Sequence, residues 1–183
     1  MEMSLTGPEK SALLEMARSS IEARVKGTAL GAGKEVESEN LLQDAGAFVT
    51  IRRHGRLRGC LGTFSSSVPL YKTVMEMAAA AASQDPRFPP MDEGELKDME
   101  IEVSVLSPLR KVEDPSEIEI GKHGIQITRG MKRGVLLPQV AMEHGFDRAG
   151  FLEAACVKAG LPERAWTEGA AICVFDAEIL KER

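Results

Sequence analysis

The sequence has few aromatic residues and few cysteines. Only 4% of its 183 residues are aromatic, which leaves little material for the stacking platforms that bind single-stranded nucleic acids. The formal net charge of -5 also argues against a general affinity for nucleic acids. The three cysteines, Cys60, Cys156 and Cys173, are an odd number without CxxC spacing. This pattern favours reduced thiols in a cytoplasm over a disulfide framework.

Long apolar runs and common cofactor motifs are absent too. No apolar run approaches the roughly 18 residues of a membrane span. The N-terminal segment MEMSLTGPEK lacks the basic flank and apolar stretch of a signal peptide. The motifs GxxxxGK(S/T), GxGxxG and GxSxG do not occur, and the histidines lack ligand spacing to a cysteine. The sequence therefore predicts a cytoplasmic protein that binds no metal or cofactor and has no membrane contact.

What is present suits one ordinary domain over residues 1–183. With 43% hydrophobic residues, the chain can bury one good core or two small lobes. Thr6 and Glu9 have capping-box spacing, and apolar residues then recur at helical intervals, which predicts a helix over 8–26 that ends at Gly27. The polar stretch 28–44 predicts a surface excursion.

The most unusual segment is 47–64, with the sequence AFVTIRRHGRLRGCLGTF. Two runs of strand-forming residues flank a His-Gly pair, which predicts a tight hairpin. A two-residue turn would place Ile51 opposite Arg58 and Val49 opposite Cys60. Arg58 and Cys60 would then be neighbours on one face of the strand, about 6.6 Å apart along it.

Such a neighbour could give Cys60 functional chemistry. The guanidinium of Arg58 would favour the thiolate form, and Gly59 and Gly62 would leave the backbone around the sulfur uncrowded. The alternative is that Cys60 is a small hydrophobic residue and Arg58 a solvated neighbour. The spacing leaves both interpretations open.

A proline-rich loop follows a helix predicted over 68–84. Its residues 85–90, DPRFPP, are stiffened by three prolines, so that Asp85 and Arg87 are presented at low entropic cost. Phe88 is expected to insert into the core. The alternative is a linker in which Asp85 caps a turn.

A strand over 99–106 alternates apolar and polar residues, which puts Glu102 and Ser104 on the face opposite the apolar one. If this strand neighbours the hairpin, five residues from three segments should converge on one concave face: Cys60, Arg58, Asp85, Arg87 and Glu102. Their mixed charges could bind a zwitterionic or phosphorylated ligand. They could equally form an ion-pair network that locks the loop.

The second part of the chain repeats the order hairpin, helix, strand. Strands are predicted at 118–120 and 125–127, helices after Pro138 and Asp147, and a last strand over 170–180. Residues 47–106 and 118–180 could therefore be an internal β-β-α-β duplication, with His-Gly turns at matching places. The fold class that follows is α+β, an antiparallel sheet with packed helices. Cys156 and Cys173 are expected in the core.

Five ordered motifs then carry a resemblance: LRGCLG at 57–62, DPRFPP at 85–90, IEVSVLSP at 101–108, LLPQV at 136–140, and CVKAGLP followed by Trp166. Together they resemble the AMMECR domain family, called AmmeMemoRadiSam system protein A in prokaryotes. The resemblance implies a compact α+β protein with a larger and a smaller lobe and its most characteristic site at the LRGC segment. It also implies a cytoplasmic protein, often encoded beside Memo-like and radical-SAM proteins, whose biochemical activity is not established. Two departures are Leu61 for a common isoleucine and Phe146 for a common tryptophan.

Two hypotheses of function remain. In the first, a groove around the LRGC segment recognises a small anionic ligand, a modified residue or a partner protein. Its candidate ligand contacts are Arg58, Asp85, Arg87, Ser104 and Gln139 of the LLPQV motif. In the second, the protein is a cysteine-dependent enzyme in which Cys60 is the nucleophile or redox thiol, helped by Arg58 and the carboxylate of Glu102 or Asp85. No histidine is placed by the sequence as a base for Cys60, which favours the binding hypothesis, although His123 or His144 from the other half of the chain could be a neighbour in space.

Overall fold

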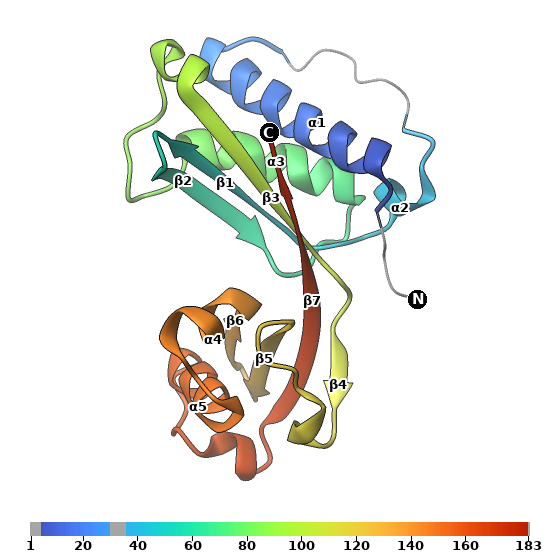
Figure 1. Cartoon of the computed structure of the whole chain (residues 1–183), viewed down its shortest axis with the longest axis vertical. Helices are drawn as coiled ribbons and strands as arrows, with labels where there is room; N and C mark the ends of the chain where they lie inside the picture. The colour runs from blue at the N-terminus through green and yellow to red at the C-terminus, as the bar shows by residue number, and fades with distance from the viewer. Residues whose placement is uncertain (1–4, 30–35, 183) are drawn as a thin grey trace. The chain divides into compact units, whose positions relative to one another are not determined.

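The computed structural model describes residues 5–29 and 36–182. The chain forms two compact units (Figure 1). Unit 1 consists of Met1–Leu106 and Glu178–Arg183, and unit 2 of Ser107–Ala177. The last strand, β7 (Ala171–Lys181), starts in unit 2 and ends in unit 1, whereas the expected second half ran unbroken from 118 to 180. None of the described helices is long and apolar enough to cross a membrane.

Unit 1 is an antiparallel sheet covered by helices. Its elements are α1 (Gly7–Lys26), α2 (Glu39–Leu42), β1 (Ala47–Arg53), β2 (Arg56–Thr63), α3 (Leu70–Ser83), the 3-10 helix η1 (Glu93–Asp98), β3 (Met99–Leu106) and the end of β7. Helix α3 contacts β1 and β2, and α1 contacts α3 and β3. The buried residues of β1, Ala47, Val49 and Ile51, share one core with Val74 and Ala78 of α3. The predicted strands, and the helix packed on them, are confirmed.

The first helix begins and ends where the sequence predicts. Glu9 accepts a hydrogen bond from the backbone N–H of Thr6 at 2.6 Å, which closes the capping box. Hydrogen bonds from Ser38 and from that N–H lower the pKa of Glu9 from 4.5 to about 2. Gly27 adopts φ 65°, a left-handed conformation that suits glycine and ends the helix. Of the predicted excursion at 28–44, residues 30–35 lie outside the described part.

The hairpin of β1 and β2 forms, but its register differs from the prediction. Arg53 faces Arg56 across the turn, yet a β-bulge shifts the pairing between Ile51 and Arg52. Ile51 therefore faces Gly59 rather than Arg58, and Thr50, not Val49, faces Cys60. The extra residue on the bulged strand is Arg58, because Leu57 and Gly59 pair with successive residues of β1.

The position of the hairpin in the sheet was also predicted wrongly. The strand order is β2-β1-β3-β7-β5-β6, so β1 is internal but β2 lies at the edge rather than near the middle. β1 pairs antiparallel with both β2 and β3. The outer edge of β2 consequently has backbone N–H and C=O groups that other segments must satisfy.

Unit 2 contains the remaining strands, further helices and a core of its own. Its elements are β4 (Arg110–Val112), the 3-10 helix η2 (Pro115–Glu117), β5 (His123–Arg129), β6 (Lys132–Leu136), α4 (Pro138–His144), α5 (Arg148–Lys158), the 3-10 helix η3 (Ala165–Thr167) and the start of β7. β7 pairs antiparallel with β4 and β5, and β5 pairs with β6. Both helices begin where predicted: Pro138 opens α4, and Asp147 caps α5 by accepting the Gly150 N–H at 2.8 Å.

The hairpin of unit 2 lies further along the chain than predicted. Residues 118–120 are not a strand, because the chain turns back there: Glu119 accepts the backbone N–H of His123 and donates its own N–H to the His123 ring nitrogen Nδ1. His123 and Gly124 thus open β5 instead of forming a turn, and the proposed match with His54-Gly55 fails. The turn that joins β5 and β6 lies at Gly130, with φ 61°.

The two remaining cysteines differ in burial. Cys156 is fully buried in the core of unit 2, as predicted. Cys173 is half-buried and lies outside that core. Its neighbours Ile172 and Val174 point into the core, so strand alternation directs Cys173 to the other face. The prediction for Cys173 was therefore wrong.

Candidate functional site

Cys60 lies on the face of the unit 1 sheet that points away from the helices. Its neighbour Gly59 faces α3, where an added Cβ would lie 2.3 Å from the carbonyl oxygen of Ala81. Alternation along the strand then turns the side chain of Cys60 to the opposite face, where it is half-buried. The hydroxyl of Thr50 lies 3.3 Å from the Cys60 sulfur and donates a hydrogen bond to it. Cys60 is therefore not a core residue.

A polar row crosses three strands on this helix-free face. Thr50 pairs with Cys60 on one side and with Glu102 on the other, and directly opposed side chains lie about 5 Å apart. Glu102 forms an ion pair with Lys181 at 3.0 Å, which extends the row to the end of β7. Ser104 lies two residues along β3 from Glu102, on the same face, and is buried.

The proline-rich loop is tied to the outer edge of β2 by Asp85. The carboxylate of Asp85 accepts the backbone N–H of Cys60 at 2.8 Å, and its side chain is only 2% exposed. Arg87 binds the same carboxylate with two nitrogens, Nε at 3.0 Å and Nη2 at 2.7 Å. The Arg87 guanidinium is the main reason that the pKa of Asp85 lies well below its usual value. Asp85 thus satisfies a backbone N–H at the outer edge of β2.

Arg87 is fixed on one side and open on the other. Besides Asp85, its Nη2 lies 3.4 Å from the backbone oxygen of Cys60, yet 55% of the side chain is exposed. The hydrogen bond to Asp85 is the main cause that raises the pKa of Arg87. Phe88 lies beside it, with its ring centre 5.6 Å from the guanidinium carbon. Phe88 is only partly buried and lies outside the core of unit 1, contrary to the prediction.

Arg58 belongs to a separate ion-pair cluster. Its Nε and Nη2 bind the two carboxylate oxygens of Glu95 at 2.7 and 2.9 Å, and Nη2 also donates to the backbone oxygen of Pro89 at 3.0 Å. Arg53 reaches the same carboxylate at 2.8 Å. The bond from Arg58 is the main cause that lowers the pKa of Glu95 to about 2. The guanidinium of Arg58 is thus paired with a carboxylate, not with the sulfur of Cys60.

Chemically, the Cys60 region offers a half-exposed thiol, a hydroxyl that donates to it, and an oriented cation at its side. The described residues contain no group of three or more His, Cys, Asp or Glu side chains that could hold a metal ion. The one histidine of unit 1, His54, lies at the hairpin tip and is 3.9 Å from Asp98. Within the described part of unit 1, no imidazole is therefore positioned to deprotonate Cys60.

Comparison with known proteins places the chain in a family. The family model AMMECR1 matches residues 14–180. The chain belongs to the AMMECR1 family. A protein of Methanopyrus kandleri is 44% identical over 84% of this chain and 81% of its own length. A protein of Nanoarchaeum equitans is 42% identical over 93% of this chain and 98% of its own length.

A solved structure extends the similarity to the fold. The crystal structure of an uncharacterized protein from Pyrococcus horikoshii matches with a TM-score of 0.77 and 36% identity, over 93% of this chain and 90% of that one. The expected AMMECR family and the α+β class are thereby confirmed. These AMMECR1 relatives carry names that state no activity, ligand or partner.

The structure of this AMMECR1 chain brings most, but not all, of the expected site residues together. Cys60, Asp85 and Arg87 are in contact, and Glu102 and Ser104 share the face of Cys60. Arg58 points into the Glu95 cluster, and Gln139 lies on α4 in unit 2. Three contributors were missed: Thr50, Glu95 and Lys181.

The missed residues differ in how well the sequence marks them. Thr50 lies between Val49 and Ile51 in an alternating strand, so it could have been assigned to the polar face without the structure. Glu95 stands at capping-box spacing from Asp92, which indicates an anchored side chain but not its guanidinium partner. Lys181 gives no comparable sequence signal.

Proposed function

We propose that the helix-free face of unit 1 binds a small anionic ligand next to Cys60, with Arg87 as the group that binds the anion. The observation that carries this proposal is the pairing of an exposed guanidinium, oriented by a buried carboxylate, with a half-exposed thiol. Asp85 holds one edge of the Arg87 guanidinium in place, so that a ligand need not order this long side chain on binding. Of the two arginines expected to hold an anion, Arg58 already binds Glu95, which leaves Arg87 for the ligand.

The ligand we expect is a carboxylate or phosphate of modest size. A guanidinium suits either group because its N–H donors lie in one plane. The Thr50 hydroxyl and the Glu102–Lys181 pair lie along the same row and offer further polar contacts. Ser104 lies beside this row. The predicted Memo-like and radical-SAM partners stay predictions, as does a cytoplasmic location.

Alkylation of Cys60 with a charged and a neutral reagent tests the proposal. Iodoacetate and iodoacetamide transfer similar groups to a thiolate with loss of iodide, but only iodoacetate carries a negative charge. The rate with iodoacetate divided by the rate with iodoacetamide should be about two- to fivefold higher for Cys60 than for the neutral thiol 2-mercaptoethanol, as expected for a partly screened ion pair. Mass spectrometry of the tryptic peptides assigns each adduct to its cysteine.

Variants of arginine separate a local effect from the general charge of the surface. Arg87→Gln should abolish the raised ratio, whereas Arg87→Lys should keep most of it. Arg56→Gln is the matched control, since Arg56 is an exposed arginine on the same strand, four residues from Cys60. Inorganic phosphate should slow the reaction of wild-type protein but not of Arg87→Gln. An unchanged rate ratio in Arg87→Gln would refute anion binding at Arg87.

A second candidate function, cysteine-dependent chemistry, is favoured by one contact. A hydroxyl that donates to sulfur stabilises the charged thiolate more than the thiol, as the Thr50 hydroxyl is placed to do. Cys60 should then react with iodoacetamide at neutral pH faster than Cys156 and Cys173, and Thr50→Val should slow it. Cys60 and Cys173 are both half-buried, so equal rates at the two would argue against cysteine-dependent chemistry. Anion binding would then be the one remaining candidate function.

A further inference from the structure

Arg58 binds groups on two sides of its guanidinium plane edge. Its Nε and Nη2 hold the carboxylate of Glu95, at 2.7 and 2.9 Å, and Nη2 also donates to the backbone oxygen of Pro89 at 3.0 Å. The side chain is only 13% exposed. A guanidinium bound in this forked way has little conformational freedom left. Arg58 is therefore suited to fix its neighbours in place rather than to take up a ligand.

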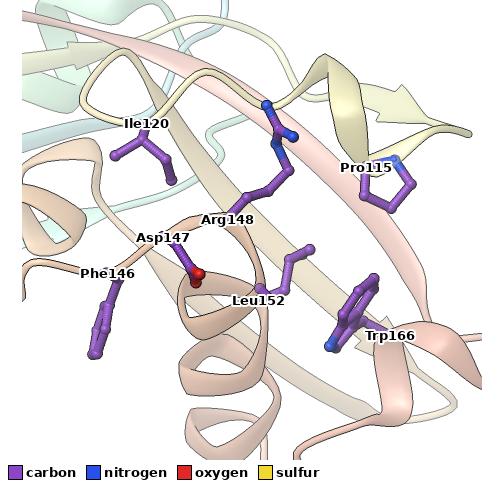
Figure 2. Close-up of a pocket in the computed structure, with 8 residues that line it drawn as sticks. Pro115, Ile120, Phe146, Asp147, Arg148, Leu152 and Trp166 are labelled. Atoms are coloured by element: carbon purple, nitrogen blue, oxygen red, sulfur yellow. The ribbon is translucent and has the colours of Figure 1, made fainter.

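Arg148 of unit 2 shows that this firm binding is not common to all arginines of the chain. It lines an open pocket together with Leu152 and Trp166 (Figure 2). Within the described part of the chain, its guanidinium makes one hydrogen bond, from Nε to the backbone oxygen of Ile118 at 3.0 Å. Arg58 makes three such bonds, and two of its three acceptors belong to a carboxylate.

The β-bulge in β2 explains why Arg58 reaches these partners. In a regular strand, Arg58 and Cys60 would lie on one face of the sheet. Leu57 and Gly59 pair with successive residues of β1, so Arg58 is the extra residue of the bulge. A bulge changes the direction of a side chain. Arg58 consequently points to Glu95 and the proline-rich loop, while Cys60 stays on the helix-free face.

The proline-rich loop is held against β2 at both of its ends. At the first end, the carboxylate of Asp85 accepts a backbone N–H of β2 at 2.8 Å. At the other end, the backbone oxygen of Pro89 accepts the bond from Arg58. The N–H of Met91 then ties the following chain to α3, not to β2. Arg87 lies between the two ends, so the bond from Arg58 limits how far this part of the loop can move from β2.

The ring of Phe88 links Arg58 to Arg87. Its centre lies 5.9 Å from the guanidinium carbon of Arg58 and 5.6 Å from that of Arg87. Both distances are within the range of a cation–π attraction. Each guanidinium also has a carboxylate partner, Glu95 or Asp85, so the ring does not join two unbalanced charges. The position of Arg58 is thereby passed on to Arg87.

We infer that Arg58 is a positioning residue of the anion site: it holds the proline-rich loop against β2 and so keeps the Arg87 guanidinium beside Cys60. This inference rests on the function proposed above. It divides the LRGC segment into a residue of the site, Cys60, and a residue that supports the site, Arg58. Without Arg58, the loop keeps its attachment to β2 at the Asp85 end, and Arg87 moves away from the sulfur more often.

The rate of Cys60 alkylation with iodoacetate, divided by the rate with iodoacetamide, measures this positioning. A variant that merely loosens the fold changes both rates together and leaves their ratio unchanged. The Coulomb energy of two charges halves when their distance doubles. If Arg87 moved to twice its distance from the thiolate, a ratio raised about fourfold in wild type would therefore fall to about twofold.

Two variants remove the support and leave Arg87 in the chain. Arg58→Gln removes the charged fork, and Phe88→Leu removes the aromatic ring without changing any charge. Each should lower a ratio raised about fourfold to about twofold or less. Arg53→Gln is the matched control, because Arg53 binds the same oxygen of Glu95 but makes no hydrogen bond to the proline-rich loop within the described part of the chain. It should keep the wild-type ratio.

A wild-type ratio in Arg58→Gln or in Phe88→Leu would overturn the inference. An equal loss in Arg53→Gln would overturn it too, since charge and not position would then be the cause. In these cases the anion site itself stands, provided that Arg87→Gln abolishes the raised ratio. If wild-type protein shows no raised ratio, the proposed function fails and this inference fails with it. Phe88 lies outside the core of unit 1, so Phe88→Leu tests the inference even if Arg58→Gln fails to fold.

Discussion

Glu95 should stabilise unit 1 strongly, and its substitution tests how the hairpin and the proline-rich loop are held together. Its carboxylate is 13% exposed and accepts hydrogen bonds from Arg58, Arg53 and the backbone N–H of Asp92. These bonds lower the pKa of Glu95 from its ordinary 4.5 to about 2. A difference of this size corresponds to about 3 kcal/mol of stability at neutral pH.

Glu95→Gln should therefore lower the free energy of unfolding by about 2 to 3 kcal/mol at pH 7. The glutamine keeps the shape but leaves the guanidiniums of Arg58 and Arg53 without a negative partner, apart from Asp98 at 3.3 Å from Arg53. The assay is urea unfolding followed by circular dichroism. Glu93→Gln is the control, because Glu93 lies exposed on the same 3-10 helix and should change stability by less than about 0.5 kcal/mol.

The pH dependence of this difference follows from the direction of the pKa shift. The folded-state pKa of Glu95 is lower than the unfolded one, so its contribution is complete above about pH 4.5 and is lost as the pH falls toward 2. The gap between wild type and Glu95→Gln should shrink to about half or less by pH 3. A gap below about 1 kcal/mol at pH 7, or one that does not change with pH, would refute this account of the cluster.

Two further substitutions probe the surroundings of Cys60. Gly59→Ala should destabilise the protein by about 1 to 3 kcal/mol in thermal unfolding, because the added Cβ would lie 2.3 Å from the backbone oxygen of Ala81. The control Gly7→Ala has free space around its Cβ and should leave stability unchanged. Equal melting temperatures of the two variants would contradict the close approach of α3 to Gly59. Asp85→Asn should lower the free energy of unfolding by about 2 to 4 kcal/mol at pH 7. Because the folded-state pKa of Asp85 is lowered, this difference from wild type should decrease only as the pH drops below about 4. If urea unfolding shows no loss at pH 7, the loop is not locked through Asp85.

The sequence by itself determined the local elements and the family. Capping residues, periodicity and glycine stops located α1, α3, α5 and β3, because these signals act over one or two turns or one strand. The same alternation placed Glu102 and Ser104 on the polar face. Ordered motifs such as LRGCLG and DPRFPP identified the family, since they span most of the chain.

Only the tertiary structure decided which groups meet. A one-residue bulge replaced Val49 by Thr50 opposite Cys60, and the two-residue turn from which the register was predicted does not indicate a bulge further along the strand. The choice between Glu95 and a ligand as the partner of Arg58 depended on how the segment after the proline-rich loop folds back over β2. Long-range pairing of charges depends on the path of the whole backbone, and short sequence patterns do not encode it.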